Sequence, residues 1–128
     1  IVKLLKNSQI KGYANVPYVD YINLLQYSSA LIGNSSSGII EAPFLHIPTI
    51  NIGTRQEGRL RSESVIDVEY DKNKIKNTIL NIISDKKFLK KIKKQKQLYG
   101  SGNSSKKIVK ILEELNLKNF PIQKKMTY

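Results

Sequence analysis

Residues 30–43 constrain the fold of this chain most, because a short apolar run passes there through a polar turn into a helix. The run from Ala30 to Ile32 predicts a strand, and the small polar residues from Asn34 onward predict a tight turn before a helix that opens near Ser37. A helix N-terminus leaves backbone N–H groups unpaired at the positive end of the helix dipole. The turn is therefore suited to binding an anion, and phosphate is the expected ligand.

The side chains around this turn extend the same argument. Ser35, Ser36 and Ser37 supply hydroxyl donors, and Gly38 lets a ligand approach the backbone closely. Glu41 follows about one helical turn further on, since a helix has roughly 3.6 residues per turn. A carboxylate there can accept hydrogen bonds from sugar hydroxyls, as in dinucleotide-binding folds. From the motif alone, serine capping of the helix with a dipole-favoured glutamate is an equally good interpretation.

The composition narrows the class of protein. A chain of 128 residues is long enough for one domain with its own core. It contains no cysteine, so it has neither a disulfide framework nor a thiolate metal site, which is typical of a cytoplasmic protein. Its apolar runs are far shorter than a membrane span, so no membrane partner is expected. The formal net charge of +12 comes mostly from lysines in the last third, which predict a solvated face.

The arginines follow a different distribution from the lysines. Arg55, Arg59 and Arg61 are the only arginines, and they fall within one short polar loop. A guanidinium offers a planar, bidentate fork for phosphate or carboxylate that an ammonium does not offer. Their concentration predicts a second anion-binding loop, in which Arg61 is the weaker candidate.

Helical and extended patterns alternate over the first 70 residues. After a helix end at residues 1–6, we expect a strand at 9–16, a helix at 18–28, a short helix at 38–45, and strands at 48–52 and 64–70. This alternation predicts an α/β fold, a Rossmann-like parallel sheet with flanking helices. Ligands of such folds bind at the carboxyl ends of the strands, so the serine turn and the arginine loop should converge on one crevice. Because no capping signal opens the chain, we expect it to begin inside a larger domain.

The pattern becomes helical beyond Asp71. We expect residues 71–118 to be C-terminal helices of the same domain as residues 1–70, and residues 119–128 to be a docked or disordered tail. The apolar faces of the three expected helices are Ile75, Ile79, Leu80 and Ile83; Phe88, Leu89, Ile92 and Leu98; and Ile108, Val109, Leu112 and Leu115.

With both loops considered, the chain resembles the UDP-N-acetylglucosamine 2-epimerase family, specifically its hydrolysing branch. Segments 33–43, 47–53, 54–59 and 64–66 carry the resemblance, which extends from about Gly12 to Asp71. The resemblance implies a GT-B fold, in which two Rossmann-like domains face each other across a cleft. This chain would be the C-terminal part of the second domain.

The resemblance also implies roles for residues of both loops. In the family the serine-rich turn holds the diphosphate of UDP, which corresponds here to Ser35 and Ser36, together with Ser37 and Gly38. The glutamate that holds the uridine ribose hydroxyls corresponds to Glu41.

The arginine loop is assigned in the same way. A family arginine close to the diphosphate and the sugar corresponds to Arg55, which would also stabilise the leaving group. Arg59 lies at the Gly-Arg of the family loop and is included among the expected UDP contacts.

The reaction implied by the resemblance eliminates UDP from UDP-N-acetylglucosamine and then hydrates the glycal to N-acetylmannosamine, for amino-sugar or sialic-acid synthesis. Arg55 and the helix N-terminus would stabilise the departing diphosphate, so no metal and no other cofactor is expected. In the family the proton-transfer groups lie in the first domain and at the start of the second. We therefore expect this chain to be inactive alone. Its expected partners are a UDP-sugar, the missing N-terminal domain and, for the full-length protein, further copies of itself.

The only histidine, His46, is expected to be structural.

Two other interpretations stay open. Another UDP-sugar hydrolase, such as one acting on a di-N-acetylated bacillosamine nucleotide, or a glycosyltransferase would use the same turn and Glu41. A basic nucleic-acid-binding module is supported by the net charge alone. Single-strand binders stack bases on aromatic side chains, and Phe88 and Tyr99 are the only aromatic residues between 71 and 119, so no nucleic-acid partner is expected.

Asp67 and Glu69 are predicted to face solvent or to cap the next helix.

Overall fold

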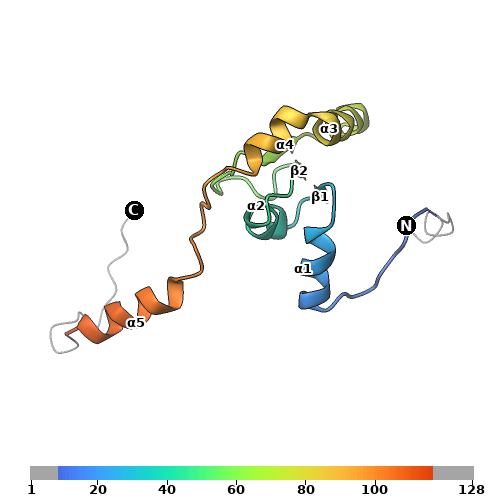
Figure 1. Ribbon diagram of the computed structural model, residues 1–128. Helices are drawn as coiled ribbons and strands as arrows, with labels where there is room; N and C mark the ends of the chain where they lie inside the picture. Colours follow the sequence, from blue (N-terminus) through green and yellow to red (C-terminus); the bar gives the residue numbers. More distant parts are fainter. Residues whose placement is uncertain (1–8, 117–128) are drawn as a thin grey trace. The chain divides into compact units, whose positions relative to one another are not determined.

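The structure is a computed structural model that describes residues 9–116. The chain divides into two compact units, Ile1–Leu98 and Tyr99–Tyr128, and each is described by itself. The first unit contains the sheet and the helices that cover it (Figure 1). The helix end expected at residues 1–6 and the tail expected at residues 119–128 lie outside the described residues.

The sheet consists of three short parallel strands in the order β1-β2-β3. These strands are Leu31–Gly33, Thr49–Ile52 and Val65–Val68. Isoleucines face one another across the sheet, because the register pairs Ile32 with Ile50 and Ile50 with Ile66. The predicted α/β class with a Rossmann-like parallel sheet is therefore confirmed.

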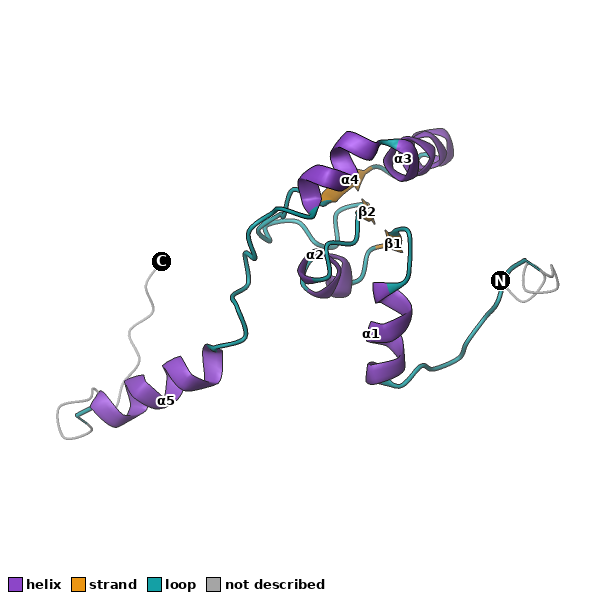
Figure 2. Cartoon of the chain, viewed as in Figure 1, coloured by secondary structure: helices purple, strands orange, loops and turns teal. Residues whose placement is uncertain are grey.

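Helices cover both faces of this sheet (Figure 2). On one side lie α1 (Tyr18–Gln26) and α2 (Glu41–Phe44), and on the other lie α3 (Lys72–Ser84) and α4 (Lys86–Ile92). Successive side chains of a strand point to opposite faces, so the core has two parts. Their buried residues are Leu25, Ala42 and Ile47 on the first side, and Ile50, Val68 and Ile82 on the second.

Aspartate caps set where the second pair of helices begins. The side chain of Asp71 accepts a hydrogen bond from the N–H of Lys74, at 2.6 Å. Asp85 accepts hydrogen bonds from the N–H groups of Lys87 and Phe88, each at 2.9 Å. Each cap satisfies backbone donors that a helix N-terminus leaves unpaired, which explains the start expected near Asp71 and the break between α3 and α4.

Two predicted elements differ from the structure. Residues 9–16 form no strand and are mostly exposed, so that prediction is wrong; an extended run needs a neighbouring strand, and none pairs with it among the described residues. The helix expected at 38–45 is split into a 3₁₀ turn, η2 (Ser36–Gly38), and the four-residue α2. Pro43 is tolerated in α2 because it lies in the first turn, where no helical N–H is needed.

The core-facing side of α3 also differs from the prediction. Ile75, Ile79 and Ile82 pack toward the sheet, whereas Leu80 and Ile83 are 51% and 44% exposed. Both faces of this helix are apolar in sequence, and packing against β2 and β3 selects between them. Leu98, expected on the second helix, lies beyond the end of α4.

The second unit contains one described helix, α5 (Ser104–Glu114), which confirms the third helix of the prediction. It buries none of its residues. The apolar residues of the helix, at 51% to 62% exposure, are Ile108, Val109, Ile111 and Leu112.

Candidate functional site

The serine turn leaves β1 at the carboxyl edge of the sheet. Its internal hydrogen bonds are donated by the N–H groups of Ser37 to Ser35 Oγ, at 3.3 Å, and of Gly38 to Ser35 O, at 3.1 Å. None of these internal bonds is donated by Ser35 or Ser36, and both residues are exposed. The N–H groups of Ser35 and Ser36 are thus placed where an anion can approach them.

Ser37 and Gly38, at the end of the turn, instead pack against neighbouring elements of the fold. Ser37 is buried, and its hydroxyl accepts a hydrogen bond of 2.7 Å from the phenol of Tyr21 in α1. At Gly38, an added Cβ would lie 2.6 Å from Thr49 Cγ2 on β2. The close approach expected at Gly38 is therefore made by the strand beneath it, and both residues hold the turn against its neighbours.

Glu41 opens α2, directly after this turn. Its side chain is half-buried, and its Oε2 is buried without a hydrogen-bond partner among the described residues. A carboxylate oxygen removed from water is costly to leave unpaired. Glu41 therefore has an acceptor available for a donor such as a hydroxyl group.

The arginine loop contacts the serine turn through one backbone atom. The carbonyl oxygen of Asn34 accepts hydrogen bonds from Arg55 Nη1, at 3.0 Å, and from Gln56 Nε2, at 2.7 Å. The loop begins at Gly53, whose φ of +76° favours glycine and whose missing side chain leaves room for the ring of Tyr70. These contacts bring the two predicted loops together at the carboxyl edge of the sheet, as expected.

The far end of the loop has different contacts. The backbone N–H of Arg59 donates to the carbonyl of Gln56, at 3.4 Å, and its side chain is exposed. Arg61 is instead paired with Asp67 of β3, with its Nε 3.1 Å from Oδ2. Asp67 therefore binds the loop rather than only facing solvent, whereas Glu69 pairs with Lys74 on the surface.

Two residues of this region were not singled out by sequence reasoning. Gln56 is only 3% exposed, and its Oε1 is buried without a partner among the described residues. Asn51 is 1% exposed and donates from Nδ2 to Asp67 Oδ1 at 2.6 Å. A glutamine in a polar loop gives no sequence signal of burial, whereas an amide within the apolar strand Thr49–Ile52 could have been recognised as a polar group that needs a partner.

His46 lies outside this edge of the sheet. It follows α2 in the left-handed region, at φ 59°, and its Nδ1 is 2.9 Å from the carbonyl oxygen of Ile92. This hydrogen bond ties the end of α2 to the end of α4, in agreement with the structural role predicted for His46.

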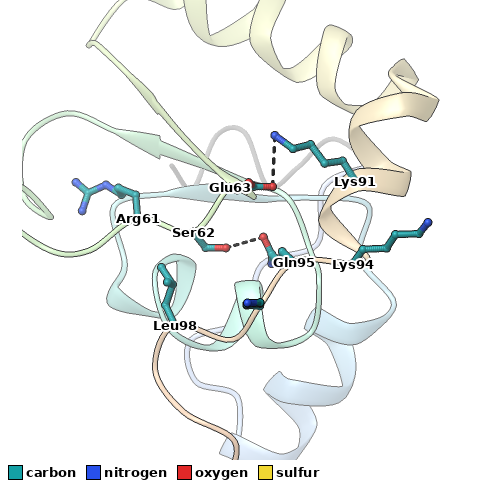
Figure 3. A pocket seen from close by; sticks show the side chains of 8 residues that line it. Arg61, Ser62, Glu63, Lys91, Lys94, Gln95 and Leu98 are labelled. Carbon is teal, nitrogen blue, oxygen red and sulfur yellow. Dashed lines mark hydrogen bonds and ion pairs between the residues drawn. The ribbon is translucent and has the colours of Figure 1, made fainter.

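A cavity of about 480 Å³ is lined by residues 61–63 and by side chains from the end of α4 and the segment after it, among them Lys91 and Lys94 (Figure 3). Among the lining residues, Ser62 donates to Gln95 Oε1 at 2.6 Å, and Lys91 pairs with Glu63 at 3.4 Å. Figure 3 shows Arg61 and Lys94 extending to opposite sides, so the positive charges do not converge on one point.

Residues 9–116 contain neither a metal-binding cluster nor a membrane-spanning helix. No three His, Cys, Asp or Glu side chains of this part gather where they could hold a metal ion. No helix within it has the length and apolar character needed to cross a membrane.

A three-stranded parallel sheet covered by helices, with an exposed polar turn and an arginine loop joined at its carboxyl edge, is a Rossmann-like α/β arrangement. The model of the family described as UDP-N-acetylglucosamine 2-epimerase matches residues 1–113. The chain belongs to this family.

Curated relatives agree with this assignment. Polysialic acid biosynthesis protein P7 of Escherichia coli is 46% identical over 95 residues, which are 74% of this chain and 24% of that protein. A hydrolysing GDP/UDP-N,N'-diacetylbacillosamine 2-epimerase of Campylobacter jejuni is 51% identical over 65 residues, 50% of this chain and 17% of that protein. The UDP-N-acetylglucosamine 2-epimerase of Neisseria meningitidis is 34% identical over 88 residues, 67% of this chain and 23% of that protein. The chain thus spans a quarter or less of the length of these relatives.

Proposed function

We propose that this chain is the UDP-binding part of a hydrolysing UDP-N-acetylglucosamine 2-epimerase. The observation that carries the proposal is the joining of the serine turn and the arginine loop at the Asn34 carbonyl, in a chain of this family. A phosphate cradle and a guanidinium placed together match the two adjacent charges of a nucleoside diphosphate.

The serine turn and Glu41 would bind different parts of the nucleotide. The exposed N–H and hydroxyl groups of Ser35 and Ser36 receive phosphate oxygens, while Ser37 and Gly38 hold the shape of the turn from beneath. The buried Oε2 of Glu41 accepts from a ribose hydroxyl, which supplies the donor that this oxygen otherwise lacks within the described residues.

The arginine loop would act on the diphosphate as a leaving group. Arg55 uses one of its five N–H donors on the Asn34 carbonyl, and its exposed position leaves the others for phosphate oxygens. Arg59 adds a second exposed guanidinium on the same loop. As UDP leaves the sugar, negative charge grows on the diphosphate, and fixed cationic donors stabilise it most at that point. The proposal therefore requires no metal or organic cofactor in this half of the site.

The complete reaction would eliminate UDP to give a glycal and then add water to yield N-acetylmannosamine. We propose that the proton-transfer groups lie outside this chain, in the first domain and at the start of the second. We therefore expect the chain to bind UDP without turnover, and the full-length protein to act as a homo-oligomer. A cytoplasmic location would suit a substrate of this kind.

Similarity to one relative supports a second candidate for the sugar of the substrate. The relative that is 51% identical is named as acting on the diacetylbacillosamine nucleotide. The UDP contacts proposed here serve either sugar, since none of them involves the sugar ring. Comparison of both UDP-sugars as ligands, and as substrates of the full-length protein, would separate the two candidates.

The test is calorimetric titration of UDP and of uridine into the chain and its variants. Glu41→Ala should weaken both ligands, whereas Arg55→Ala should weaken UDP alone, by about 1–3 kcal/mol in each case because charge-assisted hydrogen bonds are lost. Glu57→Ala is the matched control, since it removes an exposed carboxylate from the same loop. Absence of UDP binding at millimolar concentration, in a sample that circular dichroism shows to be folded, would contradict the proposal.

A further inference from the structure

The end of the arginine loop is fixed by one side chain that contacts both a strand and the loop itself. Arg61 Nε lies 3.3 Å from Asp67 Oδ1 and 3.1 Å from Oδ2, and Arg61 Nη1 donates to the backbone carbonyl of Arg59 at 2.7 Å. Arg61 therefore joins the Asp67 carboxylate on β3 to the peptide that carries the Arg59 side chain.

The orientation of Asp67 is itself set by β2. Asn51 and Asp67 are direct partners in the parallel register, and the Asn51 amide donates to Asp67 Oδ1 at 2.6 Å. Asn51 is almost fully buried, so this bond satisfies an amide that has no access to water. The aspartate is consequently held toward the loop by the sheet.

We propose that Asn51, Asp67 and Arg61 form a positioning relay that places Arg59 for the diphosphate; this inference rests on the proposed function. Gln56 holds the near end of the loop at the Asn34 carbonyl, and the relay holds the far end at β3. Between these two points lies Gly58, at φ +78° with no neighbouring atom near its Cβ position. A glycine with that freedom lets the intervening backbone move unless both ends are fixed.

The ion pair between Arg61 and Asp67 contributes little to the stability of the fold. The Arg61 and Asp67 side chains are 25% and 52% exposed, and ion pairs with this access to solvent contribute little to folding. Breaking this ion pair should therefore loosen the loop without unfolding the sheet. Arg61 is a positioning residue in this scheme, because its guanidinium is used on Asp67 and on the Arg59 carbonyl.

The first test is UDP titration with Asp67→Asn, Arg61→Gln and the double variant. Each single variant should weaken UDP binding about three- to tenfold, and the double variant should weaken it no further, since both residues act as one unit. Glu69→Gln is the matched control, because Glu69 lies just beyond the same strand but pairs with Lys74. Equal affinities of the Asp67→Asn and Glu69→Gln variants, or additive losses in the double variant, would overturn the relay.

The second test does not use the nucleotide. Trypsin cleaves after arginine and lysine, so the rate of cleavage after Arg59, divided by that after Lys76 in α3, reports order in the loop relative to the fold. Asp67→Asn should raise this ratio and Glu69→Gln should not. An unchanged ratio overturns the relay, whereas failure of the folded wild-type chain to bind UDP overturns the proposed function instead.

Discussion

Replacing Gly38 by alanine tests the packing that holds the serine turn on the sheet. The added Cβ would lie 2.6 Å from Thr49 Cγ2, whereas carbon atoms in contact prefer about 3.5–4.0 Å. One of the two groups must therefore move by about 1 Å. Thr49 cannot easily do so, because it is 2% exposed, lies in the central strand, and has a β-branched side chain with few rotamers.

The expected loss follows from this overlap. Forcing a methyl group into a packed interior costs about 1–3 kcal/mol, and the lower chain entropy of unfolded alanine returns less than about 1 kcal/mol. For a unit of this size we expect the melting temperature to fall by about 5 °C or more, measured by circular dichroism. The Thr49→Ser substitution removes Cγ2 alone, so the double variant Gly38→Ala/Thr49→Ser should recover part of the loss.

Either of two results would contradict this packing of Gly38 on Thr49. If Gly38→Ala melts with the wild-type chain, the turn does not pack on β2 as described. If Gly38→Ala is destabilised but Thr49→Ser recovers nothing in a double-mutant cycle, the clash lies with another group.

Two further predictions concern the polar contacts of the first unit. Gln95→Leu should destabilise the chain by about 2–4 kcal/mol in urea unfolding, because the Ser62 hydroxyl and the buried N–H of Ser64 lose Gln95 Oε1 as their acceptor; a loss below about 1 kcal/mol would contradict this. The pKa of Lys74 is raised, first by its hydrogen bond to the Glu69 carboxylate and then by the charge of that group. The resulting stability should be present at neutral pH and lost as pH rises above about 10 through the folded pKa. Lysine NMR titration should give Lys74 an ordinary pKa in Glu69→Gln; an unchanged pKa would show that the pair does not form.

The sequence predicted best those elements whose signals are local. The strand after Ala30, the strand before Gly53 and the helix capped by Asp71 depend on short apolar runs, a glycine and a capping carboxylate, and all three form where expected. The convergence of the two loops was predicted from topology alone, because parallel strands present their carboxyl ends at one edge.

The errors arise where distant contacts decide. Residues 9–16 have an extended pattern, but extended structure depends on a partner strand that a local pattern cannot supply. On α3 two apolar faces compete, and only contact with the sheet buries Ile82 rather than Ile83. Gln56 was missed for the same reason, since its burial depends on a carbonyl 22 positions away in the chain.

The hydrogen bonds at Asn34 have a consequence for comparing and redesigning related chains. The acceptor is a backbone carbonyl, so any residue at position 34 that keeps the backbone path can accept from Arg55 and Gln56. Positions 34 and 56 should therefore show little covariation across homologues, although they touch. In a chimera, the two loops should be transplanted together, because an arginine loop that enters without its own turn would need the host backbone to offer a carbonyl at the same place.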